Sequence, residues 1–111
     1  MLHRPVVFSY KRVIRHLIHQ GPSAKNEYPS IYPNWDNTAR SLFAGWVWQG
    51  STPELFRIHT KEAIQSVIHK EWEDRIIFVK SWNEWGEGNY LEPDRNYGRA
   101  YLEVLRDEII Q

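Results

Sequence analysis

The chain is organised around Ile76-Ile77-Phe78-Val79-Lys80-Ser81-Trp82-Asn83-Glu84-Trp85-Gly86-Glu87-Gly88. Its first four residues are β-branched or aromatic, which predicts a short buried strand. Two tryptophans, an amide, two carboxylates and two glycines follow within seven residues. In parallel α/β enzymes the chemistry lies on loops past the carboxyl ends of the strands, so this turn is the first candidate for a functional site.

Glu84 and Glu87 are three positions apart in this turn, with glycines beside them. Glycine allows a sharp turn and a close approach of a ligand to the backbone. Two carboxylates in one turn can divide acid and base roles, because the charge of one raises the pKa of the other. Cleavage of a glycosidic bond uses such a pair, and Trp82 and Trp85 offer flat apolar faces to a sugar ring. The alternative is a surface turn whose two glutamates are simply solvated.

Two further segments accompany the turn and its continuation Tyr90-Leu91-Glu92-Pro93-Asp94. They are Pro33-Asn34-Trp35-Asp36-Asn37-Thr38-Ala39-Arg40 and Gly50-Ser51-Thr52-Pro53-Glu54-Leu55-Phe56. In this order and spacing the segments resemble the WbsX-like glycosyltransferases. That carbohydrate-active family is related to the endo-mannosidases of glycoside hydrolase family 99.

The resemblance implies a (β/α)8 barrel that acts on glycans, often in lipopolysaccharide or other surface polysaccharide metabolism, with no cofactor and no metal. In the hydrolase relatives the first glutamate of the motif deprotonates the sugar 2-hydroxyl, and the second is the general acid/base. On this chain those roles fall on Glu84 and Glu87. Gly86 stands where the hydrolases commonly have His, a departure that concerns the substrate contacts and not the carboxylate pair.

The same resemblance makes a set of polar and aromatic residues candidates for substrate binding: Trp35, Asp36, Asn37, Arg40, Trp82, Asn83, Trp85 and Glu92. Other roles remain open for some of them. Asp36 either pairs with Arg40 or, together with Asn37, bonds its own backbone in an Asx-type turn. A further alternative for Arg40 is contact with an anionic group of a donor or acceptor. Glu92 either binds a sugar hydroxyl or pairs with Arg95 or Arg99.

The length of 111 residues sets the scale of the fold. A complete (β/α)8 barrel needs about 250 residues, so residues 1–111 are expected to form a partial domain, the last two or three βα units of a barrel. We expect strands near residues 6–10, 30–32 and 76–79 and helices over residues 11–20, 52–70 and 97–109. Alternation of strands and helices predicts an α/β fold with a parallel sheet.

Residue types refine these expectations. The middle helix follows an N-cap at Ser51 or Thr52, and its His59 and His69 are expected at the surface. His16 and His19 lie three positions apart without a third metal ligand nearby, so a solvated basic face is the simpler interpretation.

The bulk composition excludes several classes of protein. With 14 basic and 14 acidic residues, the chain offers no electrostatic basis for binding nucleic acid. It has no apolar run long enough for a transmembrane helix, and no cysteine. The N-terminus lacks the apolar core of a signal peptide, and we expect a cytoplasmic location.

Two classes of function remain. The first is an enzyme of glycosyl transfer or glycosidic hydrolysis, reactions that use the same carboxylates and differ in the acceptor. The second is a catalytically inactive glycan-binding or vestigial fragment, because catalysis requires side chains to be positioned to fractions of an ångström. The expected partners are a glycan or sugar donor and, through exposed apolar faces, a second copy or a complementing barrel fragment.

Overall fold

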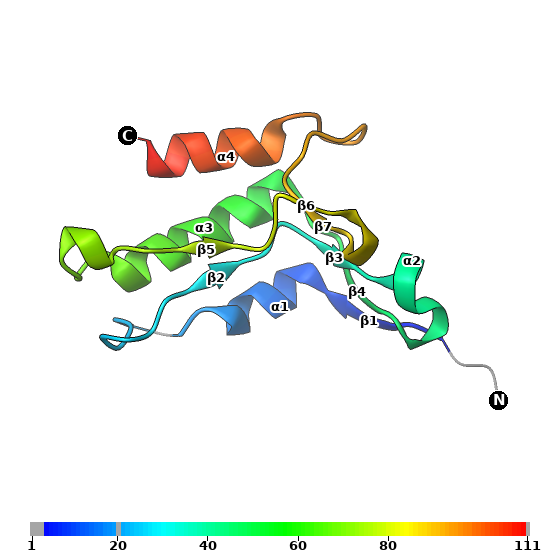
Figure 1. The fold of residues 1–111 in the computed structure, drawn as a ribbon, viewed down its shortest axis with the longest axis horizontal. Coiled ribbons are helices and arrows are strands. Elements are labelled where there is room, and N and C mark those ends of the chain that lie inside the picture. Colours follow the sequence, from blue (N-terminus) through cyan, green and yellow to red (C-terminus); the bar gives the residue numbers. More distant parts are fainter. Residues whose placement is uncertain (1–3, 20, 111) are drawn as a thin grey trace.

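The computed structural model describes residues 4–19 and 21–110, which form a mixed α/β fold (Figure 1). The helices are α1 (Tyr10–Leu17), α2 (Thr38–Ser41), α3 (Pro53–Val67) and α4 (Ala100–Ile109). The strands are β1 (Val6–Ser9), β2 (Ser30–Ile31), β3 (Trp35–Asp36), β4 (Trp46–Gln49), β5 (Phe78–Val79), β6 (Asn83–Glu84) and β7 (Asn89–Tyr90). Short 3-10 helices cover Leu42–Ala44, Trp72–Asp74 and Trp85–Glu87.

The strands form three small sheets. In the first sheet, ordered β1-β4-β3, β1 runs parallel to β4 and β3 runs antiparallel to it. In the second, β2 and β5 are parallel, and in the third, β6 and β7 form an antiparallel hairpin. The two parallel pairs agree with the predicted α/β class. Over the described residues the sheets stay separate and do not close into a barrel.

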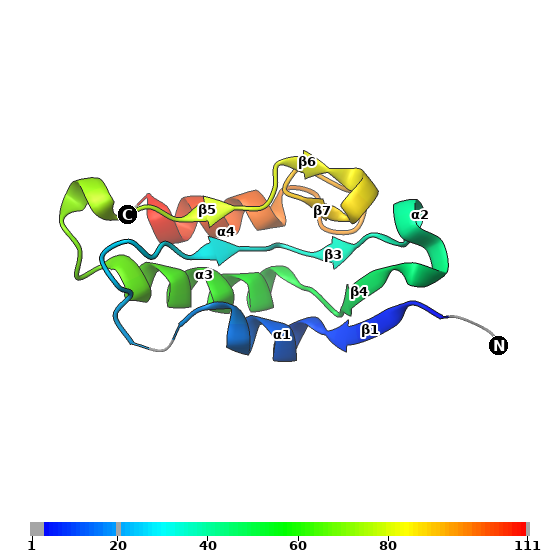
Figure 2. The same ribbon diagram turned by 60° about the horizontal axis from the view of Figure 1, so that its bottom comes forward.

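Helix α3 is the centre of the hydrophobic core and packs against both α4 and β2 (Figures 1 and 2). It begins as the sequence predicts, because the Thr52 hydroxyl accepts a hydrogen bond from the Leu55 amide at 3.2 Å. The core that it organises joins residues from both ends of the chain: Ile18, Ile31, Phe56, Ala63, Leu91, Tyr101 and Val104. Residues 35–41 and the glutamate turn lie side by side at one end of the molecule (Figure 2).

His59 corrects the prediction that it lies at the surface, because its side chain is fully buried on the face of α3 that covers β2. The Tyr32 amide donates a hydrogen bond to its Nε2 at 3.2 Å. Burial lowers the pKa of His59 to about 4. Its helical spacing from Phe56 and Ala63 predicts this buried face, whereas its residue type alone led to the expectation of a solvent-exposed side chain.

The last helix begins later than predicted, at Ala100 rather than near Tyr97. The Asp94 carboxylate accepts a hydrogen bond from the Tyr97 amide at 2.8 Å, and the Gly98 amide donates to the Asp94 carbonyl at 2.9 Å. This closed turn, with Gly98 in the left-handed region, delays the helix. The first helix also ends early, at Leu17, and the predicted end at Gln20 lies outside the described residues.

Of the strand predicted at residues 76–79, only Phe78–Val79 form a paired strand, β5. The prediction that this segment is buried is wrong for two of its residues. Ile76 is 42% exposed and Phe78 is 57% exposed. β5 pairs with β2 alone among the described strands, which leaves its other edge without a described strand partner. Val7 in β1 is similarly exposed, at 55%. Among residues 4–19 and 21–110, no helix combines the length and apolar character needed to cross a bilayer.

Candidate functional site

The glutamate turn is built by the chain that follows β5. The chain leaves β5 through a cis peptide bond between Lys80 and Ser81, forms β6, turns in the short helix Trp85–Glu87 and returns in β7. The turn lies against β3 and α2, the segment predicted to bind substrate (Figure 2). The structure thus brings together two motifs that are more than 40 residues apart in the sequence.

Gly88 permits this contact between the motifs. Its φ is +56°, a backbone conformation that glycine adopts without steric cost. An ideal Cβ at this position would lie 2.5 Å from the Asp36 carbonyl oxygen and 2.7 Å from the Asp36 amide nitrogen. Both the turn and the close approach of two backbones therefore require glycine here.

Three polar side chains that sequence reasoning did not assign to the site stabilise this arrangement: Asn34 and Asn89 join the two segments, and Ser81 braces the glutamate turn itself. The buried Asn89 side chain donates a hydrogen bond to the Asn34 carbonyl at 2.5 Å, and the Tyr90 amide donates to Asn34 Oδ1 at 3.0 Å. The Ser81 hydroxyl donates to the Asn89 carbonyl at 2.6 Å and accepts from the Glu84 amide at 3.1 Å. Asn34 and Ser81 lie inside the quoted motifs, and this position was the only sequence feature that could have marked them as part of the site.

Arg40 lies between the two carboxylates. Its Nη2 is 2.8 Å from Glu84 Oε1, and its Nη1 is 3.3 Å from Glu87 Oε1. An ideal Cβ at Gly86 would lie 2.6 Å from Arg40 Nη2, so a larger residue would displace the guanidinium group. Glycine at position 86 therefore gives Arg40 access to both carboxylates, and the departure from the hydrolase pattern has a structural consequence.

The open alternatives for Asp36 are decided in favour of local bonding, whereas Asn37 bonds to β4 and not to its own backbone. Asp36 Oδ1 accepts hydrogen bonds from the Thr38 amide at 3.0 Å and from the Thr38 hydroxyl at 2.5 Å, which is the Asx-type turn. Asn37 Oδ1 accepts from the Trp46 amide at 2.6 Å. Arg40 pairs with the two glutamates instead of with Asp36. Residues 35–36 form β3 and residues 38–41 form α2.

Aromatic side chains line a pocket of about 340 Å³ beside the carboxylates. Trp35 and Trp48 form one wall, with ring centroids 5.7 Å apart, and Trp85 stacks on Tyr90 with centroids 3.7 Å apart. Stacking covers one face of the Trp85 ring and leaves the other available, since the residue is 46% exposed. Burial raises the pKa of Tyr90, whose hydroxyl also donates to Asp94.

The remaining predicted residues lie at the rim. Trp82 is 52% exposed and Asn83 is also exposed. The Trp82 carbonyl accepts hydrogen bonds from the amides of Leu91 and Glu92, which ties the two arms of the turn together. Within the described chain, Glu92 forms no ion pair with either neighbouring arginine. No three His, Asp or Glu side chains converge as a metal site in residues 4–19 and 21–110.

Fold and site together define a mixed α/β protein whose paired carboxylates lie among aromatic side chains past the end of a parallel strand. The sequence comparison is more specific. The model of the family described as glycosyltransferase WbsX matches residues 2–105, and the chain belongs to that family.

Two relatives carry the name uncharacterized protein WxcX, both from Xanthomonas campestris pv. campestris. The protein of strain B100 is 29% identical over 104 residues, which covers 93% of this chain and 15% of the relative. The protein of a second strain is 32% identical over 83 residues, which covers 74% of this chain and 12% of the relative. This chain therefore spans less than a sixth of either relative. No solved structure matches the chain.

Proposed function

We propose that residues 1–111 form the C-terminal part of a (β/α)8-barrel domain that acts on glycans, by glycosyl transfer or by glycosidic hydrolysis. Membership of a family of glycosyltransferases supports the substrate class. The two parallel strand pairs, and the placement of the glutamate turn past β5, support the architecture. Lipopolysaccharide or another surface polysaccharide is the proposed setting, and the cytoplasmic location stays a prediction from the sequence.

One observation carries the catalytic part of the proposal: a single guanidinium group contacts both glutamates. Arg40 draws the carboxylates of Glu84 and Glu87 toward one point in space. Two glutamates that were each solvated independently would not converge in this way. A glycosidic bond placed beside the guanidinium group would meet both carboxyl groups, the pair that its cleavage uses. This convergence supports the catalytic interpretation over the solvated-turn alternative.

Roles follow from the chemistry of glycosyl transfer. Glu87 gives a proton to the leaving oxygen and takes one from the incoming acceptor, which is water in hydrolysis and a sugar hydroxyl in transfer. Glu84 acts as its base or nucleophile partner. The aromatic candidates provide surfaces for sugar rings, and the polar candidates bind hydroxyl groups: Trp35, Trp82, Trp85, Asp36, Asn37, Asn83, Arg40 and Glu92.

The test is the variant Glu87→Gln, which keeps the shape of the side chain and removes its proton-exchanging group. We expect turnover to fall by roughly 100-fold or more, the usual contribution of a general acid/base, while glycan binding measured by calorimetry is retained. Glu103→Gln, an exposed glutamate on α4, is the matched control. Product analysis with and without a sugar acceptor separates transfer from hydrolysis. Unchanged turnover in Glu87→Gln would remove this residue from the reaction.

A second candidate, glycan binding without turnover, is favoured by the exposure of the site. The Arg40 side chain is 58% exposed, and the chain matches only 12–15% of its relatives. The apolar residues Val7 and Phe78 are exposed on the strands, where a second copy or a complementing barrel fragment would pack. Glycan binding by the wild-type chain, with no product under either condition, would identify this function. Its mass in solution would show whether the chain self-associates.

A further inference from the structure

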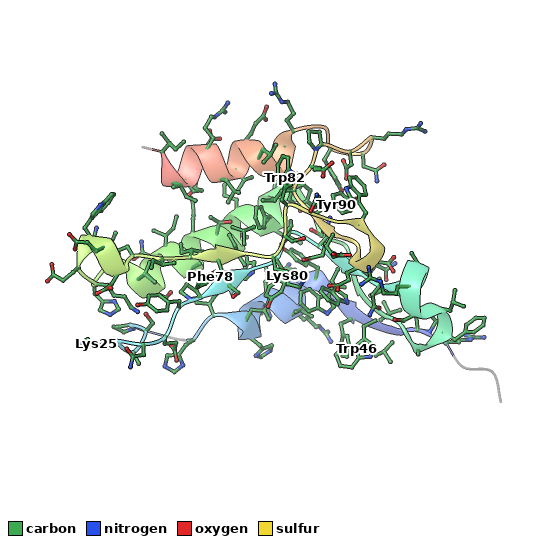
Figure 3. The ribbon with its side chains drawn as sticks, viewed as in Figure 1. Lys25, Trp46, Phe78, Lys80, Trp82 and Tyr90 are labelled. Atoms are coloured by element: carbon green, nitrogen blue, oxygen red, sulfur yellow. The ribbon has the colours of Figure 1, made fainter. Side chains whose placement is uncertain are left out.

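Lys80 is held at the site by the backbone of β5. Its amide donates a hydrogen bond to the Ile31 carbonyl at 3.0 Å, which continues the pairing of β5 with β2 by one residue. The side chain therefore starts from a fixed point at the place where the strand ends and the glutamate turn begins (Figure 3). Sequence reasoning assigned no role to this residue, because its neighbours in the motif carry the resemblance.

The ammonium group of Lys80 lies beside one particular oxygen of Glu87. Nζ is 3.2 Å from Oε2, which is buried and accepts no directed hydrogen bond from the described residues. The contact is thus an ion pair between a point charge and an enclosed carboxylate oxygen. Arg40 contacts the other oxygen, Oε1, so each oxygen of Glu87 faces its own cation.

Glu84 has a different environment. Its side chain is 39% exposed and pairs with Arg40, whereas the Glu87 side chain is 23% exposed and pairs with both cations. The two carboxylates are therefore held unequally. Lys80 contributes to the difference by adding a second cation to Glu87.

The Trp35 ring restricts where the lysine can go. Nζ lies 5.8 Å from the ring centroid, within the range of a cation–π interaction. A lysine side chain has four rotatable bonds and otherwise loses much of its rotamer freedom when it is held in one place. The aromatic wall and the Glu87 carboxylate together confine it, although its side chain is 43% exposed.

We propose that Lys80 is a positioning residue for Glu87: it holds Oε2 inside the turn, so that Oε1, the oxygen that Arg40 contacts, is the one that exchanges a proton with the glycan. This inference rests on the proposed function. The buried Oε2 has no access to a ligand, so the exposed part of the carboxylate must supply the reacting atom. Without the ammonium group, Oε2 is enclosed without an ionic partner and the carboxylate rotates out of the turn.

The first experiment compares kcat and KM of Lys80→Met, Lys80→Arg and the wild-type chain. We expect Lys80→Met to lower kcat by about tenfold, equivalent to about 1.4 kcal/mol of transition-state stabilisation, and to change KM by less than about twofold. Lys80→Arg restores a cation and is expected to recover most of kcat. The matched control is Lys61→Met, because Lys61 also pairs with a carboxylate, Glu108 at 3.8 Å, far from the site.

The second experiment needs no turnover and reads the Glu87 carboxyl carbon by NMR, with its resonance assigned by its loss in Glu87→Gln. We expect Lys80→Met to shift this resonance, Lys80→Arg to bring it back toward the wild-type position, and Lys61→Met to leave it unchanged. An unmoved resonance in Lys80→Met overturns the positioning role, whether or not the chain turns over a glycan. If the chain is active, a wild-type kcat in Lys80→Met also overturns the positioning role.

The two proposals fail in distinguishable ways. Full turnover in Glu87→Gln overturns the proposed function, while the carboxyl resonance still reports the contact with Lys80. Loss of turnover in Glu87→Gln with wild-type kcat in Lys80→Met overturns only the inference about Lys80. Failure of Lys80→Arg to restore the kcat that Lys80→Met loses would show that the shape of the side chain at position 80, and not its charge, determines kcat. That result would overturn positioning by the ammonium group.

Discussion

The stability of the folded chain should fall in mild acid because of His59. Its ring is buried, and Nε2 accepts the Tyr32 amide, so the proton of the neutral ring is on Nδ1. Nδ1 is itself buried without a partner among the described residues. A second proton would put a charge where water cannot reach, and burial accordingly lowers the pKa of His59 to about 4 from its ordinary value of 6.5.

The sign and size of the effect follow from proton linkage. Between pH 6.5 and about 4 the unfolded chain binds a proton at His59 and the folded chain does not, so stability is fully present above pH 6.5 and falls as the pH drops. At about 1.4 kcal/mol per pH unit, the loss reaches roughly 2 kcal/mol by pH 5 and levels off near roughly 3 kcal/mol at pH 4.

The assay is urea unfolding followed by tryptophan fluorescence at several pH values between 4 and 7, with wild-type and His59→Gln chains compared. Glutamine keeps an oxygen that can accept the Tyr32 amide but does not titrate. The difference between the two free energies of unfolding isolates His59 from the carboxylates that titrate in the same range. His16→Gln, an exposed histidine on α1, is the control and should follow the wild type. A difference that stays flat from pH 7 to pH 4 would refute a buried, neutral His59.

Two further predictions concern backbone features of the fold. Gly88→Ala should lower the free energy of unfolding by more than about 2 kcal/mol, because left-handed backbone strain of about 1–2 kcal/mol adds to an overlap with the backbone of Asp36. Gly98→Ala is the control: Gly98 has the same φ of +56° in open space, so this variant should lower the free energy of unfolding by the strain alone. Equal losses for the two variants in urea titrations would contradict the overlap. Thr52→Ala should cost about 1 kcal/mol by removing the hydroxyl that caps α3 at the Leu55 amide, and an unchanged urea midpoint would show that the cap contributes nothing.

Local signals predicted the three longer helices and the strands β1, β2 and β5, but not β3, β4, β6, β7 or α2. Thr52, Pro53 and the apolar spacing of Phe56, Ala63 and Val67 place the start and the buried face of α3 correctly. The strand at residues 6–9 and the parallel class follow from short β-branched runs that alternate with helices. Such signals fail where a nearby side chain competes for the backbone, as at Tyr97, whose amide bonds to the Asp94 carboxylate instead of continuing the helix.

The candidate site divides in the same way. The motifs predicted which residues belong to the site, but not which of these residues contact one another. Arg40 reaches Glu84 and Glu87 across more than 40 residues, and no local pattern distinguishes that partner from Asp36, four residues away. Lys80 gave no sequence signal, because its role depends on where the turn folds back.

By itself, the sequence determined which residue types are present, where the three longer helices and the strands β1, β2 and β5 lie, and the family to which the chain belongs. These follow from local backbone preferences and from a motif read in a fixed spacing. Tertiary structure alone decided that Arg40 bridges the carboxylates, that Lys80 faces Glu87, and that His59 is buried. Electrostatic contacts and burial depend on distance in space, and the fold sets that distance by pressing the turn at Gly88 against Asp36.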